Sequence, residues 1–363
     1  MGFALYLVSL GLQRALITDP LVARSGMVPK NPDLVGKAFT CVLVFASAMS
    51  GCLLIIGTAI REPDLQRSLI TFAAWLIPLL VQDFWRVILF MRRQPGAAAL
   101  NDTLWLIGIG IASPLLFFVS GVSGVITVWA AGGAAGAALG FWQTRVMPRH
   151  LKKAFSWWRV EAWPLGRWLL FESFSYTAGG QGVVFILYMY LGANDIGGLR
   201  AVQAAFAPLT LLIPAIALPG LPAISRAYAQ SRSEALKLVR IMGLLAFGGT
   251  AIYTMTLWGL HGSVLAGLFG NDFVGFAPLI LPIAAAQLAQ AGTVAYPLLL
   301  KVENRGKVLL VGRTIGTLVL ITVSWFLVSR YGILGGAWGM SIGAAIGAIA
   351  VAVGANRQQS NAA

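Results

Sequence analysis

Charge is scarce in this chain of 363 residues: only 10% of them are Asp, Glu, Lys or Arg, while 58% are apolar. A water-soluble domain carries about 25% charged residues, because its surface must be covered by groups that interact with water. A chain so poor in charge cannot cover a soluble surface. The composition therefore predicts an all-α, multi-pass membrane protein, since helices satisfy their own backbone hydrogen bonds in lipid.

Residues that bind metals or form disulfides are also scarce, with two cysteines and two histidines in the whole chain. Cys41 and Cys52 lie in one apolar run, and 11 positions along a helix separate them by about 16 Å, too far for a disulfide. His150 and His261 lie in different segments, and no CxxC motif is present. The sequence therefore predicts neither a metal site nor a cofactor.

Long apolar runs dominate the sequence. A helix needs about 20 mainly apolar residues to cross the hydrocarbon core of a bilayer. Eleven runs meet this requirement approximately, at residues 3–18, 38–60, 68–91, 103–119, 124–144, 166–191, 196–222, 238–260, 274–300, 308–328 and 332–354. Residues 103–144 contain no charge. The boundary between the runs 103–119 and 124–144 therefore depends on the Ser-Gly-Val-Ser-Gly stretch at 120–124.

Basic residues outnumber acidic ones by 26 to 12, a net charge of +14. Successive loops lie on opposite sides of the predicted membrane. The loops on one side contain twenty basic residues, and the loops on the other side contain four. Basic residues mark cytoplasmic loops, so we expect a plasma (inner) membrane protein with a cytoplasmic C-terminus, and no nucleic-acid binding. In this orientation the chain begins on the outer side of the membrane with a short apolar run. We therefore expect that one preceding helix is missing.

Glycines recur at every fourth position in two of the runs, which places them on one helix face and allows close helix packing. They are Gly132, Gly136 and Gly140 in the first of these runs, and Gly335, Gly339, Gly343 and Gly347 in the second. The two runs end the two halves of the chain, and other spacings also match between the halves. The pattern predicts a parallel internal repeat in which the run 166–191 has no partner.

The repeat predicts four regions along the chain. They are an incomplete five-span bundle at 1–144, a basic and aromatic linker at 145–165, a six-helix bundle at 166–354 and a short cytoplasmic tail at 355–363. The linker contains tryptophans among its basic residues, which is typical of a segment that lies on anionic lipid at the membrane interface.

Several ionisable residues lie within the predicted spans, where each needs a partner or a watery cavity. Asp83 and Arg86 are three positions apart, so they either form an ion pair or line a cavity in which Asp83 binds a proton or a cation. Arg14, Arg86 and Arg200 together predict a positively charged central cavity for an anionic substrate. For Arg200, reaching out to the membrane surface is the alternative.

Polar uncharged residues extend this predicted site. Gln82, Gln287 and Gln290 are further candidates for substrate binding in the central cavity. Glu172 is the best candidate, beside Asp83, for a group that couples transport to H⁺ or Na⁺. A polar stripe that faces a lumen or another helix follows it, made of Ser173, Thr177, Gln181 and Tyr188.

Three local strings are similar to sequences of one family. They are Arg14-Ala-Leu-Ile-Thr-Asp-Pro-Leu-Val-Ala-Arg24, Gln82-Asp83-Phe-Trp-Arg86 with Arg92-Arg93-Gln-Pro-Gly96, and Gly197-Gly-Leu-Arg-Ala-Val-Gln-Ala-Ala-Phe-Ala-Pro208 followed by Leu-Pro-Ala-Ile-Ser-Arg226. With the repeat and the basic linker, they resemble the polysaccharide-biosynthesis (Wzx-like) flippase branch of the MATE/MOP exporter superfamily. The resemblance implies two six-helix lobes, alternating access, and transport of a polyprenyl-pyrophosphate-linked oligosaccharide, whose charge suits the three arginines.

Three other functions remain open from the sequence. A MATE-type multidrug exporter driven by H⁺ or Na⁺ should be acidic within the membrane, whereas here three arginines stand against two acids. An enzyme that polymerises or ligates surface glycans should have a large outer loop, and the longest predicted one, 261–273, is short, so we expect no enzyme. A non-transporting or truncated membrane partner protein is suggested only by the short N-terminal run.

Overall fold

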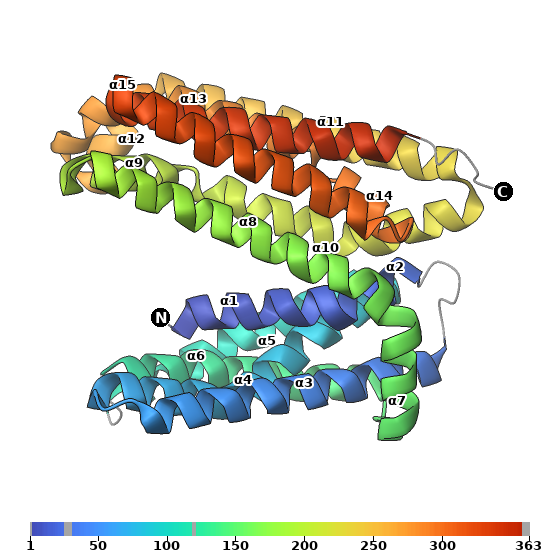
Figure 1. Cartoon of the computed structure of the whole chain (residues 1–363). Coiled ribbons are helices and arrows are strands. Elements are labelled where there is room, and N and C mark those ends of the chain that lie inside the picture. The colour runs from blue at the N-terminus through green and yellow to red at the C-terminus, as the bar shows by residue number, and fades with distance from the viewer. Residues whose placement is uncertain (1, 25–30, 118–120, 358–363) are drawn as a thin grey trace. The chain divides into compact units, whose positions relative to one another are not determined.

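The computed structural model describes residues 2–24, 31–117 and 121–357 (Figure 1). Helices make up nearly all of these residues, and none of them lies in a strand. This confirms the predicted all-helical fold class. The chain divides into two compact units, Met1–Arg167 and Trp168–Ala363, which are described separately below.

The first unit is built from seven helices and the start of an eighth. They are α1 (Gly2–Gln13), α2 (Asp19–Arg24), α3 (Pro32–Ala59), α4 (Pro63–Met91), α5 (Pro95–Ala112), α6 (Gly121–Thr144), α7 (Leu151–Trp157) and α8 (Trp163–Tyr190). Proline begins α3, α4 and α5, where its fixed φ suits a helix and its missing N–H costs nothing. The Asn31 side chain also caps α3 by accepting the backbone N–H of Asp33 at 3.0 Å.

Helix α4 forms the centre of the first unit and packs against both α3 and α6. Its middle section is apolar around most of its circumference, so that Leu76, Phe84 and Trp85 are all fully buried. The glycines of α6 allow this packing: a Cβ at Gly140 would lie 2.6 Å from Trp85 Cβ, and one at Gly132 would collide with the backbone oxygen of Trp105 in α5.

The second unit continues with α8 and adds seven helices. They are α9 (Ala193–Ala205), α10 (Ala207–Gln230), α11 (Arg232–Gly259), α12 (His261–Phe269), α13 (Ile280–Thr293), α14 (Tyr296–Val302) and α15 (Gly306–Asn356). Two predicted spans are interrupted. Residues 196–222 divide at Phe206, just before Pro208, and residues 274–300 divide at Val294, just before Pro297, because proline supplies no N–H to continue a helix.

Helix α15 contains both of the last two predicted spans. Its backbone reverses at Gly332, where φ is 58° and ψ is −144°, a conformation that favours glycine. Figure 1 shows the two halves side by side, in orange-red and red. The predicted glycine face lies in this contact, since a Cβ at Gly339 or Gly343 would collide with the backbone of Ser324 or Leu320 respectively.

Among the described residues, seven helical segments are long and apolar enough to cross a membrane: Pro32–Ala59, Pro63–Met91, Gly121–Thr144, Ala207–Gln230, Arg232–Gly259, Asn271–Val302 and Gly306–Asn356. The last contains two of the eleven predicted spans. The three runs without a counterpart, 3–18, 103–119 and 166–191, fall in helices that are shorter or more polar. The α1 helix has 12 residues, for example, and α8 contains Glu172.

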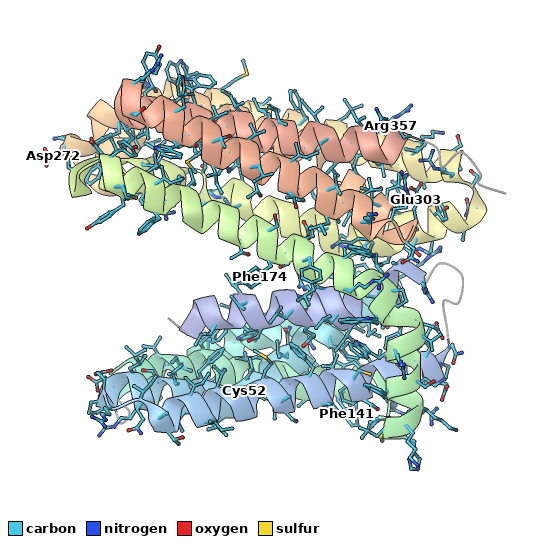
Figure 2. All side chains as sticks on the ribbon, in the orientation of Figure 1. Cys52, Phe141, Phe174, Asp272, Glu303 and Arg357 are labelled. Carbon is cyan, nitrogen blue, oxygen red and sulfur yellow. The ribbon has the colours of Figure 1, made fainter. Side chains whose placement is uncertain are left out.

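Charged residues form ion pairs near helix ends in each unit. In the first unit, Asp33 pairs with Lys37 at 2.7 Å and with Arg149 at 3.1 Å, which ties the start of α3 to the segment before α7. In the second unit, Figure 2 shows Glu303 and Arg357 at one end and Asp272 at the other. Glu303 accepts hydrogen bonds from Arg232 and Arg305 at 2.7 and 2.9 Å.

Candidate functional site

A cluster of two arginines and one aspartate occupies the interior of the first unit. Asp83 of α4 is fully buried. The Arg14 guanidinium donates to both of its carboxylate oxygens, at 3.0 and 2.5 Å, and Arg86, one turn along α4, donates to Oδ1 at 2.6 Å. Asp83 and Arg86 therefore form the ion pair expected from their spacing, and Arg14 joins it from another helix.

A π-helical segment, Arg14–Thr18, presents Arg14 to this cluster. Such a wide turn redirects side chains and is frequent at functional sites. The preceding residue anchors the segment, because the Gln13 side chain donates to the backbone oxygen of Leu80 in α4 at 3.1 Å. Trp158 anchors it from the other side by donating to the backbone oxygen of Leu16 at 3.2 Å.

The cluster carries more positive than negative charge in its buried part. Two guanidinium groups share the single carboxylate of Asp83, and their side chains stay 24% and 20% exposed for Arg14 and Arg86. A second carboxylate, Asp102 of α5, lies 3.8 Å from Arg86 and is 45% exposed, so it lies outside the buried part of the cluster. Both arginines thus keep donor groups that a ligand can reach.

Gln82 lies beside this cluster but points into the packed interior between three helices. It is fully buried, and its amide donates to Asn101 Oδ1 at 2.9 Å and to Asp102 Oδ1 at 3.1 Å. Asn101 in turn donates to the backbone oxygen of Gly136 at 2.7 Å. This network joins α4, α5 and α6, and the substrate contact expected of Gln82 stays a prediction.

The second unit contains a partly open cavity of about 510 Å³ lined by residues of α8, α9, α10, α13 and α15. The predicted site residues Thr177, Gln287 and Gln290 all line it. Gln203, Arg313 and Ser341 add further polar groups to its wall. A pocket of this size, with a few polar groups in an apolar wall, is typical of a small-ligand site or of a subsite for a larger ligand.

Glu172 pairs with Arg313 at the edge of this cavity. Arg313 Nε lies 3.3 Å from Glu172 Oε1, and the two side chains are 25% and 17% exposed. Sequence spacing does not identify Arg313 as the partner of Glu172, because the two residues lie far apart along the chain. A charged residue seven positions into an apolar helix was the signal that could have identified it.

The other residues predicted for the polar stripe and the cavity are placed as follows. Ser173 is half-buried and Tyr188 is exposed, and neither is among the residues that line the cavity. The side chain of Gln181 lies outside the described part of the chain. Arg200 of α9 is exposed and donates to Gln203 Oε1 at 3.0 Å, which links it to a residue of the cavity wall.

No protein-family model and no curated protein matches this sequence. Solved structures do match it. An outward-facing multidrug resistance MATE family transporter of the MOP superfamily matches 97% of this chain and 85% of its own, with a TM-score of 0.84 and 12% identity. An inward-facing structure with the same description matches 98% and 88%, with a TM-score of 0.64 and 12% identity.

A third solved structure is a MOP superfamily transporter from Pyrococcus furiosus, described as having a binding pocket of reverse polarity that suggests a different function. It matches 97% of this chain and 85% of its own, with a TM-score of 0.75 and 12% identity. All three are transporters rather than enzymes. The chain therefore has the fold of the MATE transporters, and with its seven long apolar segments it is a multi-pass membrane protein.

Proposed function

We propose that the protein is a transporter that moves a polyprenyl-pyrophosphate-linked oligosaccharide across the membrane by alternating access, for surface polysaccharide biosynthesis. The observation that carries this proposal is the surplus of guanidinium groups around Asp83. A pair of arginines with only one buried carboxylate favours an anionic ligand such as a pyrophosphate and disfavours an organic cation. A solved transporter of this fold, described as having a binding pocket of reverse polarity that suggests a different function, supports the idea that proteins of this fold differ in function.

In this proposal Arg14 and Arg86 bind the pyrophosphate, and Asp83 positions them. The bidentate contact between Arg14 and Asp83 fixes the guanidinium plane, which leaves its remaining N–H groups directed at the ligand. Arg200 of the second unit, which donates to the neutral Gln203, stays a separate candidate contact for an anionic group. Gln287 and Gln290 are suited to hydrogen bonding with the uncharged hydroxyl groups of a sugar.

The experiment that tests this function removes the gene and analyses lipid-linked oligosaccharides by mass spectrometry. We expect finished, unpolymerised repeat units on polyprenyl pyrophosphate to accumulate while surface glycan is lost. Wild-type protein should restore both. A variant with Arg14→Gln, Arg86→Gln and Asp83→Asn, which leaves no unpaired charge in the interior, should restore neither despite normal membrane levels. An unchanged lipid-linked pool with intact surface glycan would exclude the proposal.

A second candidate function is cation-coupled export of drugs, as in the multidrug resistance transporters that share this fold. The specific observation in its favour is Glu172, a carboxylate at the edge of a 510 Å³ cavity. An exporter of this kind should extrude ethidium from cells in a manner that depends on pH and on Glu172. Export of ethidium that Glu172→Gln abolishes, with lipid-linked glycans unchanged by gene removal, would make this the function.

A further inference from the structure

An apolar groove in the first unit lies apart from the arginine cluster and has no role in the proposed transport. It has a volume of about 440 Å³ and runs between the π-helical segment, α3 and α7. Val44 and Phe45 of α3 form one wall, Phe155 and Trp158 form a second, and Leu16 and Ile17 of the π-helical segment form the third. We call it the linker groove. Lys152 is the one charged residue among the described residues that line it.

The groove is a built feature, because hydrogen bonds hold its walls in place. The Thr40 hydroxyl donates to the backbone oxygen of Arg149 at 2.9 Å and accepts the N–H of the same residue at 2.7 Å, which fixes the start of α7 against α3. Phe155 and Trp158 stack with ring centroids 5.6 Å apart. The Trp158 indole also bonds the π-helical segment, so all three walls are connected.

Charge around the groove identifies what can fill it. Residues 145–167 contain six Lys and Arg residues and one acid, Glu161, which pairs with Arg24. The nearby Asp33 already pairs with Lys37 and Arg149. Lys152 and its neighbour at position 153 are exposed, and within the described ranges neither forms an ion pair. The mouth of the groove is therefore positively charged while its walls are apolar.

We propose that the linker groove binds an anionic phospholipid, with one acyl chain along the apolar walls and the phosphate at Lys152 and Lys153. Anionic lipids concentrate in the cytoplasmic leaflet, on the side where the positive charge of this segment predicts it to lie. An uncharged ligand would gain nothing from the two lysines. A water-soluble anion would gain nothing from the aromatic walls.

Cys41 provides a probe, since it lines the groove and is a free thiol. In the background Cys52→Ser, it is the single thiol of the chain. The purified protein in detergent is titrated with phosphatidylglycerol or with phosphatidylcholine of the same acyl chains, and the rate of alkylation by N-ethylmaleimide is measured. We expect phosphatidylglycerol to slow the labelling of Cys41 in a saturable manner, and phosphatidylcholine to leave it unchanged.

Two sets of variants test whether the lipid binds at the two lysines and in the linker groove. Lys152→Gln and Lys153→Gln should each weaken phosphatidylglycerol binding about fivefold, whereas Lys237→Gln, at an exposed lysine of α11, should have no effect. Val44→Trp fills the groove and should abolish the protection of Cys41. Ile55→Trp, on an exposed part of the same helix outside the groove, is the matched control.

Labelling in sodium dodecyl sulfate verifies that Cys41 reacts fully once the protein is unfolded. The proposal is overturned if both lipids protect Cys41 equally, if protection survives the loss of both lysines, or if neither lipid slows labelling. Native mass spectrometry gives an independent readout: phosphatidylglycerol adducts should persist in Ile55→Trp and disappear in Val44→Trp. Adducts of equal abundance in the two variants would contradict binding in this groove.

Discussion

The two units of the protein each hold a carboxylate–arginine pair within an apolar helix, but they enclose it differently. In the first unit, Asp83 is fully buried and is held by both Arg14 and Arg86. In the second, Glu172 meets Arg313 at 3.3 Å, and both side chains stay partly exposed beside a cavity. Two cations hold the first carboxylate in a closed interior, whereas the second lies partly exposed at the edge of a cavity.

This difference indicates separate roles for the two acids. A buried carboxylate held by two cations stays charged and positions the groups around it. Glu172 is partly exposed at the edge of a cavity, so a ligand in that cavity can reach it more easily than it can reach Asp83. We therefore interpret Asp83 as the positioning group of an anion site and Glu172 as the candidate for coupling.

The strongest test of this comparison is the loss of each carboxylate. Asp83→Asn leaves two guanidinium groups without a charged partner in the interior, so we expect it to destabilise the first unit by about 3–5 kcal/mol. Thermal unfolding in detergent, followed by size-exclusion chromatography, measures this. Asp64→Asn, at the exposed start of the same helix, should cost less than about 1 kcal/mol. Equal losses in the two variants would show that Asp83 does not hold the cluster.

A double substitution separates the positioning role from the substrate contact. Arg86→Gln removes the surplus cation, so adding it to Asp83→Asn should recover stability by about 0.5–3 kcal/mol. Transport should stay lost, because Arg86 is proposed to bind the substrate. If the double variant transports better than Arg86→Gln alone, Arg86 serves only to neutralise Asp83.

The glycine faces test whether the two units depend on close helix packing to the same degree. Gly343→Ala pushes a methyl group into the backbone of Leu320, so we expect a cost of about 1–3 kcal/mol. Gly132→Ala should cost a similar amount in the first unit, where it meets Trp105. Gly248→Ala, which meets no atom within 4 Å, is the control and should be neutral or slightly stabilising. Thermal unfolding of the three variants gives the comparison.

The smallest expected change in stability is at Glu172. Glu172→Gln breaks one ion pair that is partly exposed, so it should cost on the order of 1 kcal/mol and leave expression intact. Its effect should appear in the pH profile instead: transport by the variant should no longer vary with pH. A wild-type profile in Glu172→Gln would remove the coupling role and leave the second ion pair a structural feature.

Apolar runs, proline and glycine predicted much of the fold, because helix formation in lipid depends on local composition. The starts of α3, α4 and α5 at proline and the glycine contacts within α15 follow from such local rules. The predicted spans 196–222 and 274–300 each run across an interruption, at Phe206 and at Val294. Proline in a span can either bend a helix or divide it, and the neighbouring helices decide which occurs.

The candidate site was predicted only in part, since its pairs join distant parts of the chain. The spacing of Asp83 and Arg86 identified their contact, which is local to one helix turn. The contact of Asp83 with Arg14 spans 69 positions, and the one between Arg313 and Glu172 joins α15 to α8. Sequence periodicity places each residue on a helix but does not say which helices become neighbours.

Transport by the purified protein in liposomes tests the central claim most directly. A fluorescent polyprenyl-pyrophosphate-linked oligosaccharide is placed in both leaflets, and dithionite quenching reports the fraction that reaches the outer one. The account predicts rapid exchange with wild-type protein and none with a stably folded variant in which Arg14→Gln and Arg86→Gln are combined with Asp83→Asn. Exchange that is unaffected by these substitutions, or uptake of ethidium without any movement of the anionic lipid, would contradict it.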